Sequence, residues 1–530
     1  MTDYLAHMRT DRRLPAVLCA VVLALLLTPA AALAADAPAP WKPVSGLPLQ
    51  EPQRLHARDG VLKVTLDAEL RTISVSGSKV VAQPFNGRLI GPTLHVRPGD
   101  TIDVTFRNAT PQDTNIHFHG MHVSPKGDGD NVFRRFRAGT TVHTRVTLPL
   151  DHSPGTYWYH AHFHGLTEPQ LMGGMSGLIV VEGLEKLLPP KLRGIRQRQI
   201  AIRDLQTPQS MPWTTALSGE AIDVQKPTMR LVDARLQPRT ALRSGETQLW
   251  RLANIGSDLF YDVQLEGHRF VVLAEDGSPK WRVRSVNHLV MPPGKRFDVL
   301  VVGGKPGRYV FRTLPYHREE GFEALPEAKL MDVDVLPRKG RPDVPAVPAR
   351  LATPAGPVTG KVVKRRTFTF SFDFKSQEFA RINGQAFDPT KTNVAPYVNT
   401  VEEWTLRNTT GEDHPFHIHV NDFQVMSVNG KRFHASGLQD VVIIPHKRNG
   451  RPGEVVIRIP FDQFTGHFVF HCHILAHEDG GMMFTVQVRK RGEPVTPPPG
   501  AAHAHQHMLR SSNALICRLR KLGATRLRTV

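Results

Sequence analysis

The sequence predicts an all-β fold built from three related β-sandwich domains. The 530-residue chain is 40% hydrophobic and contains 42 Gly and 43 Pro without a fixed period, which excludes collagen and a disordered chain and is typical of short strands joined by turns. A unit made of a turn and an alternating strand occurs three times, and a second turn-and-strand unit follows each copy. These repeats indicate three homologous all-β domains.

The N-terminus, residues 1–34, is predicted to be an export signal. Basic residues ending at Arg13 precede the apolar stretch Leu14–Leu27, and Ala32 and Ala34 are the small residues that a signal peptidase reads. The arginine pair weakly resembles a twin-arginine signal, and an uncleaved membrane anchor is the alternative. We expect cleavage, and therefore a periplasmic or secreted protein with no stable membrane span.

The first repeated unit alternates apolar and polar residues, which is the period of a half-buried strand. Its three copies are Val96–Asn108, Leu242–Asn254 and Val398–Asn408. The second unit reads as a turn followed by a strand, at residues 154–160, 306–312 and 465–471. Its first and third copies end in His160 and His471, whereas the middle copy ends in Arg312.

The repeats place the three domains at residues 50–183, 195–337 and 361–490. A proline-rich linker, residues 338–360, separates the second domain from the third. The C-terminal tail, residues 491–530, is basic and contains His503, His505 and His507, and we expect it to be disordered. If the histidines that end the second unit are metal ligands, the middle domain carries no metal.

Charge and cysteine content exclude several classes of protein. The formal net charge is +19, but the basic residues outside the tail are dispersed and form no stripe with aromatic residues, so we expect no nucleic-acid partner. The three cysteines, Cys19, Cys472 and Cys517, exclude a disulfide scaffold, a cysteine-rich zinc site and covalent haem attachment. Cys472 is the only one within the body of the chain.

The most informative histidines form four His-x-His pairs, which are His117 with His119, His160 with His162, His417 with His419, and His471 with His473. Residues two apart on a strand point to the same face, so each pair directs two imidazoles at one site. Two pairs belong to the first domain and two to the third, at equivalent places in the repeat. Eight imidazoles in this arrangement favour a borderline metal such as copper or zinc.

Cys472 predicts a second metal site, because the strand period turns its side chain away from the histidines on either side. The other candidate ligands are His414, His477 and Met482, with Met483 as the alternative thioether. Two histidines, one thiolate and a weak thioether are the ligand set of a blue-copper electron-transfer centre.

These segments resemble the copper-ligand motifs of the multicopper oxidase family, and the resemblance extends over residues 50–490. Within the family they are similar to the bacterial laccase-like enzymes of the spore coat and periplasm. The resemblance implies three cupredoxin-like Greek-key domains and four copper ions. It implies that type 1 copper is bound by His414, Cys472, His477 and Met482, type 2 copper by His117 and His417, and the type 3 pair by His119, His160, His162, His419, His471 and His473.

The resemblance also implies a reaction. A laccase-like enzyme takes single electrons from phenols or aromatic amines and reduces dioxygen to water by four electrons, so its partners are a small-molecule reductant and dioxygen. Asp130 and Glu478 fall where the family places carboxylates that assist this reduction, with Asp128 as the alternative to Asp130. The alternative functions are oxidation of cuprous or other metal ions in copper tolerance, and a non-enzymatic role as a periplasmic scaffold or copper-binding protein.

Overall fold

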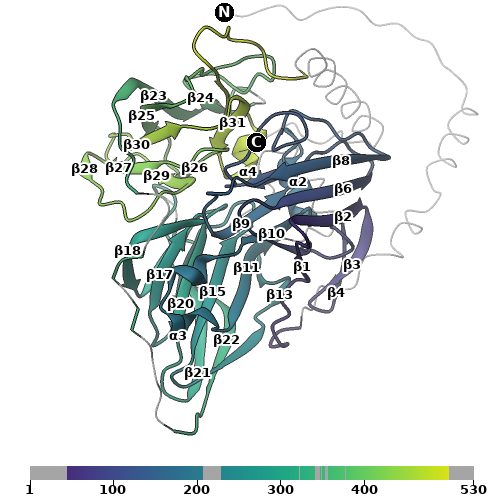
Figure 1. Cartoon of the computed structure of the whole chain (residues 1–530), viewed down its shortest axis with the longest axis vertical. Helices are drawn as coiled ribbons and strands as arrows, with labels where there is room; N and C mark the ends of the chain where they lie inside the picture. Colours follow the sequence, from purple (N-terminus) through teal and green to yellow (C-terminus); the bar gives the residue numbers. More distant parts are fainter. Residues whose placement is uncertain are drawn as a thin grey trace, which may run out of the picture. The chain divides into compact units, whose positions relative to one another are not determined.

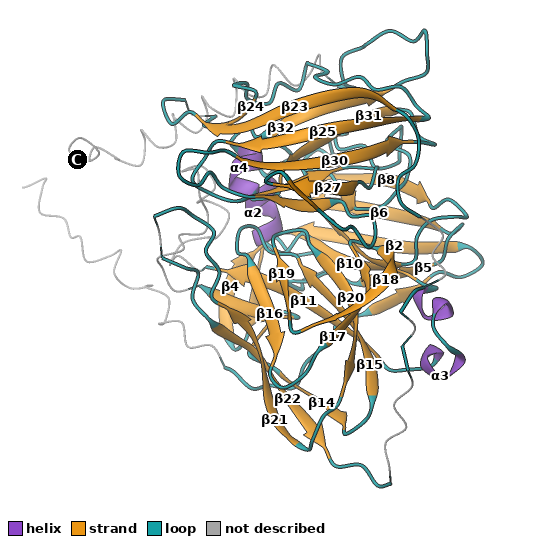
Figure 2. Ribbon diagram, turned by 90° about the vertical axis from the view of Figure 1, so that its left-hand side faces the viewer, coloured by secondary structure: helices purple, strands orange, loops and turns teal. Residues whose placement is uncertain are grey.

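The computed structural model describes residues 44–206 and 228–500, except residues 322, 341–345, 348, 352–355 and 377. The predicted export signal, the tail beyond residue 500 and part of the predicted linker therefore lie outside the described residues. The described residues form many strands and a few short helices (Figures 1 and 2), which confirms the all-β prediction. None of the described helices is long and apolar enough to cross a lipid bilayer.

The strands of the first predicted domain form three sheets. The largest has the order β1 (Arg54–His56), β5 (Thr93–Val96), β10 (Ser176–Val181), β9 (Gly155–His160) and β7 (His117–His119). A three-stranded sheet has the order β2 (Val61–Glu69), β6 (Thr101–Ala109) and β8 (Thr140–Thr147). A separate hairpin contains β3 (Arg71–Val75) and β4 (Ser78–Ala82).

The strands of the second predicted domain form two sheets. The seven-stranded sheet has the order β13 (Arg235–Leu236), β12 (Met229–Val232), β11 (Gln197–Leu205), β15 (Thr247–Asn254), β20 (Arg296–Val302), β17 (Phe270–Glu275) and β18 (Ser278–Val286). The five-stranded sheet has the order β14 (Arg239–Arg243), β22 (Ala328–Leu336), β21 (Gly307–Leu314), β16 (Tyr261–Leu265) and β19 (His288–Met291).

The strands of the third predicted domain also form two sheets. The six-stranded sheet has the order β24 (Ala380–Ile382), β23 (Val362–Phe372), β25 (Thr400–Asn408), β30 (Gly453–Phe461), β27 (Gln424–Val428) and β28 (Lys431–Arg432). The four-stranded sheet has the order β29 (Val441–Ile444), β26 (His414–Ile418), β31 (Gly466–Cys472) and β32 (Met483–Val488). We propose that these three groups of sheets are the three domains.

Among the described residues the helices are few and short. They are α2 (Thr167–Met172), the 3-10 turn η1 (Leu184–Leu187), α3 (Pro190–Arg193) and α4 (Leu475–Asp479). Figure 2 shows α2 of the first domain beside α4 of the third. The Asp479 carboxylate at the end of α4 accepts hydrogen bonds from the backbone N–H groups of Gly165, Thr167 and Glu168 at the start of α2. This contact holds the first and third domains together next to the histidine pairs.

The repeated units of the sequence are strands in the structure. The first unit corresponds to β6, β15 and β25, and the second to β9, β21 and β31. In β6, buried Ile102, Val104 and Phe106 alternate with more exposed residues, as the sequence predicts. The prediction of a half-buried strand is wrong for β15, in which every residue is buried. Its second face is covered by the first domain, where Arg251 lies 3.4 Å from the Thr156 hydroxyl.

Arg203 on β11 is a buried cation that joins the first and second domains. Its guanidinium donates hydrogen bonds to the backbone carbonyls of Leu89 (2.7 Å), Leu171 (2.9 Å) and Met172 (3.0 Å). Burial lowers the pKa of Arg203 to about 10, so the side chain stays charged at neutral pH. These charge-assisted bonds replace the water that the cation and the carbonyls lose on folding.

We expect Arg203→Met to lower the free energy of unfolding by about 3–5 kcal/mol, because it leaves buried carbonyls without a donor. Denaturant titration of the folded chain measures the loss. Arg282→Met, at an exposed position on β18, is the control and should change stability by about 0.5 kcal/mol or less. Equal effects in the two variants would contradict the role given to Arg203.

Candidate metal centres

The smaller of two candidate metal centres lies in the third domain and contains Cys472, His414 and His477. Cys472 Sγ lies 3.5 Å from His414 Nδ1 and 3.7 Å from His477 Nδ1, and all three side chains are buried. The pairing of β26 with β31 brings the first two together, since Phe416 stands opposite Cys472 in the register. The turn after β31 leads into α4, which carries His477 back over the cysteine.

The two methionines that follow α4 occupy different surroundings. Met482 is completely buried in the same apolar cluster as Cys472, and its carbonyl accepts the Cys472 N–H at 3.1 Å. Met483 lies on β32 and packs with Phe387 and Val469 instead. The backbone of Met482 therefore lies beside that of the cysteine, whereas the Met483 side chain packs in a separate cluster.

The buried side chains of this centre are better suited to binding a metal ion than to exchanging protons with solvent. Burial raises the pKa of the Cys472 thiol well above its ordinary value, and burial lowers the pKa of His414 to about 3. Neutral imidazoles can donate lone pairs to an ion, and a bound cation is what would stabilise a thiolate in this apolar setting.

The larger centre gathers the four predicted His-x-His pairs between the first and third domains. In the first domain β7 pairs with β9, so His117 stands opposite His160, and in the third domain His417 stands opposite His471. Rings from the two domains then stack, with centroids 3.6 Å apart for His117 and His419 and 3.8 Å apart for His119 and His417. Every one of the eight imidazoles is almost completely buried; they are His117, His119, His160, His162, His417, His419, His471 and His473.

The ring nitrogens of these histidines converge in groups. His471 Nε2 lies 3.1 Å from His162 Nε2 and 3.3 Å from His419 Nε2. In another group, His473 Nε2 lies 3.3 Å from His119 Nδ1. A ring nitrogen of His160 lies within 4.8 Å of a ring nitrogen of His119. Two ligands on one ion with bonds of about 2.0–2.1 Å stand at separations of this size. His117 can be grouped with His119 and His160 or with His417 and His419.

The hydrogen bonds of the outer ring nitrogens select the tautomers that bind metals. The Nδ1 atom of His160 is 2.8 Å from the Ala161 carbonyl, and that of His417 is 3.0 Å from the Asp440 carbonyl. In the described part of the chain, the opposite Nε2 atoms of both rings, and that of His117, are buried without a hydrogen-bond partner. A metal-binding imidazole has this pattern, because one nitrogen donates to an acceptor while the other keeps its lone pair.

Burial also keeps the ligand candidates neutral. Loss of water lowers the pKa of most of the eight imidazoles, among them His162, whose pKa falls to about 4. Unpaired lone pairs on neutral rings, gathered in groups, fit the copper ions that the sequence predicts.

Two carboxylates, Asp130 and Glu478, lie against the outer edges of these rings. Both Asp130 oxygens are 2.9 Å from His117 Nδ1, and Asp130 also accepts the Phe118 N–H at 2.8 Å. Glu478 lies 3.1 Å from His471 Nδ1 and 3.4 Å from His162 Nδ1. Asp128, the alternative that the sequence left open, points to solvent and pairs with Arg134 at 2.8 Å.

The two carboxylates have opposite electrostatic tendencies. Burial raises the pKa of Asp130 to about 8, so it holds a proton at neutral pH. Burial also acts to raise the pKa of Glu478, but its contacts with His162 and His471 prevail and hold the pKa well below its ordinary value. At neutral pH the centre thus contains one protonated carboxyl group and one ionised carboxylate.

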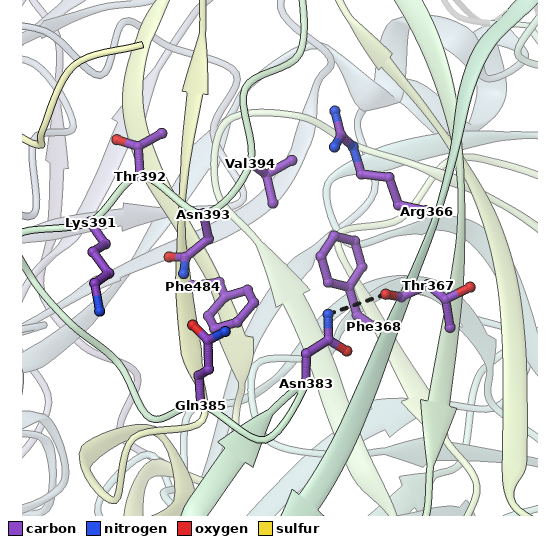
Figure 3. A pocket seen from close by; sticks show the side chains of 10 residues that line it. All are labelled: Arg366, Thr367, Phe368, Asn383, Gln385, Lys391, Thr392, Asn393, Val394 and Phe484. Carbon is purple, nitrogen blue, oxygen red and sulfur yellow. Dashed lines mark hydrogen bonds between the residues drawn. The ribbon is translucent and has the colours of Figure 1, made fainter.

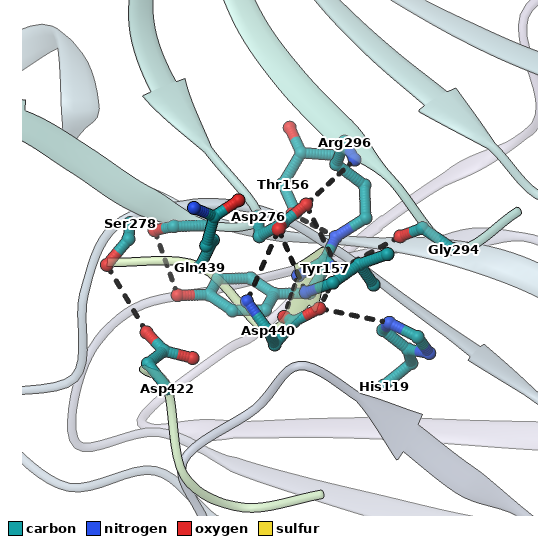
Figure 4. A network of polar contacts seen from close by, with 12 residues as sticks. His119, Thr156, Tyr157, Asp276, Ser278, Gly294, Arg296, Asp422, Gln439 and Asp440 are labelled. Carbon is teal, nitrogen blue, oxygen red and sulfur yellow. Dashed lines mark hydrogen bonds and ion pairs between the residues drawn. The ribbon is translucent and has the colours of Figure 1, made fainter. Parts of the chain in front are cut away.

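The sequence analysis missed an ion pair between Asp440 and Arg296, which supports the larger centre from behind. Asp440 lies 3.3 Å from His119 Nε2, and Arg296 donates two hydrogen bonds to it, at 2.7 and 2.6 Å. Arg296 belongs to the middle domain and also donates to the Thr156 carbonyl of the first domain. Figure 4 shows this pair at the centre of a polar network that includes Asp276.

The ion pair is buried and closely packed, so larger side chains cannot be accommodated beside it. Burial alone would raise the pKa of Asp440, but Arg296 holds it below its ordinary value. Gly120, which has a φ of +80°, passes so close that a Cβ atom there would overlap both side chains. No local spacing pattern reveals the pair, because its members are far apart in the sequence. The one available signal was Gly120 directly after the first His-x-His pair.

A separate pocket in the third domain contains none of the predicted ligands (Figure 3). It is lined by polar residues such as Arg366, Asn383 and Asn393 around Phe368 and Phe484. Asn383 donates a hydrogen bond to the Thr367 carbonyl at its rim.

We expect Arg296→Lys to lower the affinity for metal at the larger centre about 10–100-fold, since Lys cannot make the two-point contact with Asp440, whose carboxylate lies 3.3 Å from His119 Nε2 and 3.5 Å from His417 Nδ1. Copper analysis and electron paramagnetic resonance of the loaded protein measure the loss, while the absorption of copper at Cys472 should persist. The control is Arg312→Lys, which alters an ion pair with Glu327 away from the histidines. Full, spectroscopically unchanged copper in Arg296→Lys would contradict this role.

The sequence was compared with protein families and with curated proteins. Three family models, each described as multicopper oxidase, match residues 68–186, 197–331 and 357–492. Multicopper oxidase mco of Staphylococcus aureus is 26% identical over 416 residues, covering 77% of this chain and 83% of that protein. The cell division protein FtsP of Escherichia coli is 26% identical over 406 residues, covering 72% and 80%.

Solved structures show the same fold. A multicopper oxidase of Campylobacter jejuni, described as a metallo-oxidase, has a TM-score of 0.72 and 23% identity, covering 86% of this chain and 98% of that one. The laccase-like CueO of Ochrobactrum sp. has a TM-score of 0.69 and 25% identity, covering 83% and 100%. The chain therefore belongs to the multicopper oxidase family and is a copper-dependent oxidoreductase that uses dioxygen.

Proposed function

We propose that the protein is a laccase-like oxidase of phenols or aromatic amines. The observation that carries this proposal is a group of three phenylalanines, Phe372, Phe374 and Phe379, between solvent and His477. The Phe372 ring meets His477 edge-on at 5.0 Å, and the Phe379 ring lies 6.0 Å from it. Phe374 stacks on Phe379 at 5.8 Å and is 78% exposed.

An exposed aromatic ring over a buried ligand is suited to an aromatic electron donor. A phenol can stack on the exposed ring of Phe374. Such aromatic stacking stabilises a complex by about 0.5–1.5 kcal/mol beyond the contribution of the buried area. Two aromatic rings, Phe374 and then Phe379 or Phe372, then separate the phenol from His477. The sequence patterns gave no indication of this group, because the three rings come from the end of β23 and the loop that follows it.

The alternative function, oxidation of cuprous or other metal ions, has one observation in its favour. Glu412 lies 3.5 Å from His477 Nε2 and offers a carboxylate beside the same ligand. However, Glu412 is buried and forms an ion pair with Arg318 at 3.1 Å, so its charge is already compensated. The similar Campylobacter jejuni protein is described as a metallo-oxidase, but the likeness to it shows the fold alone. We rank this function second.

We propose four copper ions, with the ligand assignment that the sequence analysis gave. When bound, they supply one-electron redox chemistry and the binding of dioxygen. Cys472 lies between His471 and His473 in the chain, so the backbone of three residues connects the smaller centre to the larger one. Asp130 orients His117 and holds a proton, and Glu478 orients His471 as an ionised carboxylate. We also propose that the chain is exported to the periplasm or secreted.

The substrate proposal predicts the behaviour of Phe374→Ala. Loss of the stacking surface should raise the KM for a phenolic dye about threefold to tenfold, which corresponds to about 0.5–1.5 kcal/mol, and leave the rate with Cu(I) unchanged. Phe433→Ala, at another exposed phenylalanine, is the control. Much higher catalytic efficiency of the unmodified enzyme with Cu(I) than with any phenol in a reductant panel would overturn the ranking.

The proton-transfer proposal predicts the behaviour of Asp130→Asn. Asp130→Asn keeps the size of the side chain but removes the proton that it holds, so oxygen consumption should fall about a hundredfold or more, while the absorption of copper at Cys472 is unchanged. The matched control is Asp128→Asn in the same loop, which should keep the normal rate. An oxygen electrode measures both. Normal turnover in Asp130→Asn would remove this residue from the mechanism.

A further inference from the structure

Three side chains at the opposite edge of the first domain form a cluster that the copper centres do not use. In the sheet order β1-β5-β10-β9-β7, the candidate copper ligands lie on β7, at the end of β9 and just after it, whereas His56 and His95 lie on β1 and β5. These two strands run parallel, and His56 stands beside His95 in the register. Side chains at registered positions of neighbouring strands share one face of the sheet.

Glu182 completes the cluster. It follows β10, and its backbone N–H donates to the Val96 carbonyl, which extends the pairing of β10 with β5. Its Oε1 atom lies 3.3 Å from His56 Nδ1 and 3.6 Å from His95 Nδ1. One possible ligand atom from each of the three residues lies within 4.8 Å of the other two. Two ligands of a tetrahedral zinc ion stand about 3.3 Å apart, so little movement separates this arrangement from a bound site.

We propose that His56, His95 and Glu182 bind a divalent transition-metal ion such as Zn²⁺, with water as the remaining ligand. Two imidazoles and one carboxylate are a known zinc ligand set that keeps an open position. The exposures of the side chains, 58% for His56, 29% for Glu182 and 7% for His95, provide an open side from which the ion arrives and a fixed inner ligand.

Neighbouring residues hold two of the three ligands in position. Arg97 Nε donates to Glu182 Oε2 at 3.3 Å, which directs the other oxygen at the histidines. Beneath the site, the Gln199 side-chain amide is 2.9 Å from His95 Nε2, and Thr93 Oγ1 donates to Gln199 Oε1 at 2.7 Å. Partners of this kind orient metal ligands, and the charge of Arg97 is met by the carboxylate oxygen that faces away from the ion.

The Gln199 amide also accommodates the proton of His95. When Nδ1 binds an ion, the ring proton sits on Nε2 and needs an acceptor. A half-turn of the amide brings its carbonyl oxygen to Nε2, and Thr93 then accepts from the amide nitrogen, because a hydroxyl can take either role. In both orientations the Gln199 amide stays hydrogen-bonded to His95 and to Thr93.

The test is calorimetric titration of the copper-loaded, full-length protein with ZnCl₂. The experiment uses a background in which His503, His505 and His507 are replaced by Ala, so that tail histidines cannot contribute. We expect about one Zn²⁺ per chain, and a fall in affinity of about 10–100-fold in His56→Ala and in Glu182→Gln. His143→Ala, at an exposed histidine on β8 of the same domain, should bind zinc as the background protein does.

The absorption of copper at Cys472 is recorded for each variant and should not change, which shows that folding and the copper centres are intact. His56 is exposed, so its replacement should not disturb the core. The proposal is overturned if the background protein binds no zinc, or if His56→Ala binds zinc as tightly as His143→Ala does. Neither result depends on which reductant the enzyme oxidises.

Discussion

The burial of eight imidazoles at the interface of two domains is the constraint on which the rest of the structure depends. A buried polar atom that lacks a hydrogen bond costs about 1–3 kcal/mol. Several ring nitrogens here are in this position within the described residues, including those of His117, His160 and His417. Copper bound by these nitrogens would recover that free energy, so the arrangement that is costly for an empty protein would favour binding of the metal.

Because the imidazoles come from separate domains, the geometry of the centre depends on how precisely these domains pack against each other. Asp479 connects α4 to α2, and Arg296 of the middle domain reaches both Asp440 and the Thr156 carbonyl. The middle domain therefore contributes a positioning residue to a centre whose predicted ligands all lie in the other two domains. Charged residues suit this task, because a buried ion pair tolerates few alternative geometries.

The sequence predicted what is encoded locally and missed what depends on distant pairing. Alternation along a strand and the four His-x-His pairs are short-range signals, and they correctly predicted the strands and the groups of imidazoles. The choice between Asp128 and Asp130 needed burial, since both lie in one loop two residues apart. Arg296, Asp440 and the cluster around Glu182 arise from segments far apart in the chain, and no spacing rule reaches them. The full burial of β15 was likewise set by a neighbouring domain.

The central claim is that copper occupies two separate centres held by these side chains. Anomalous diffraction at the copper edge, from crystals of the copper-loaded protein, tests it most directly. We predict one peak among Cys472, His414 and His477, and a second group of peaks among the eight imidazoles of the larger centre. Anomalous density confined to surface histidines, with both buried centres empty, would contradict the account.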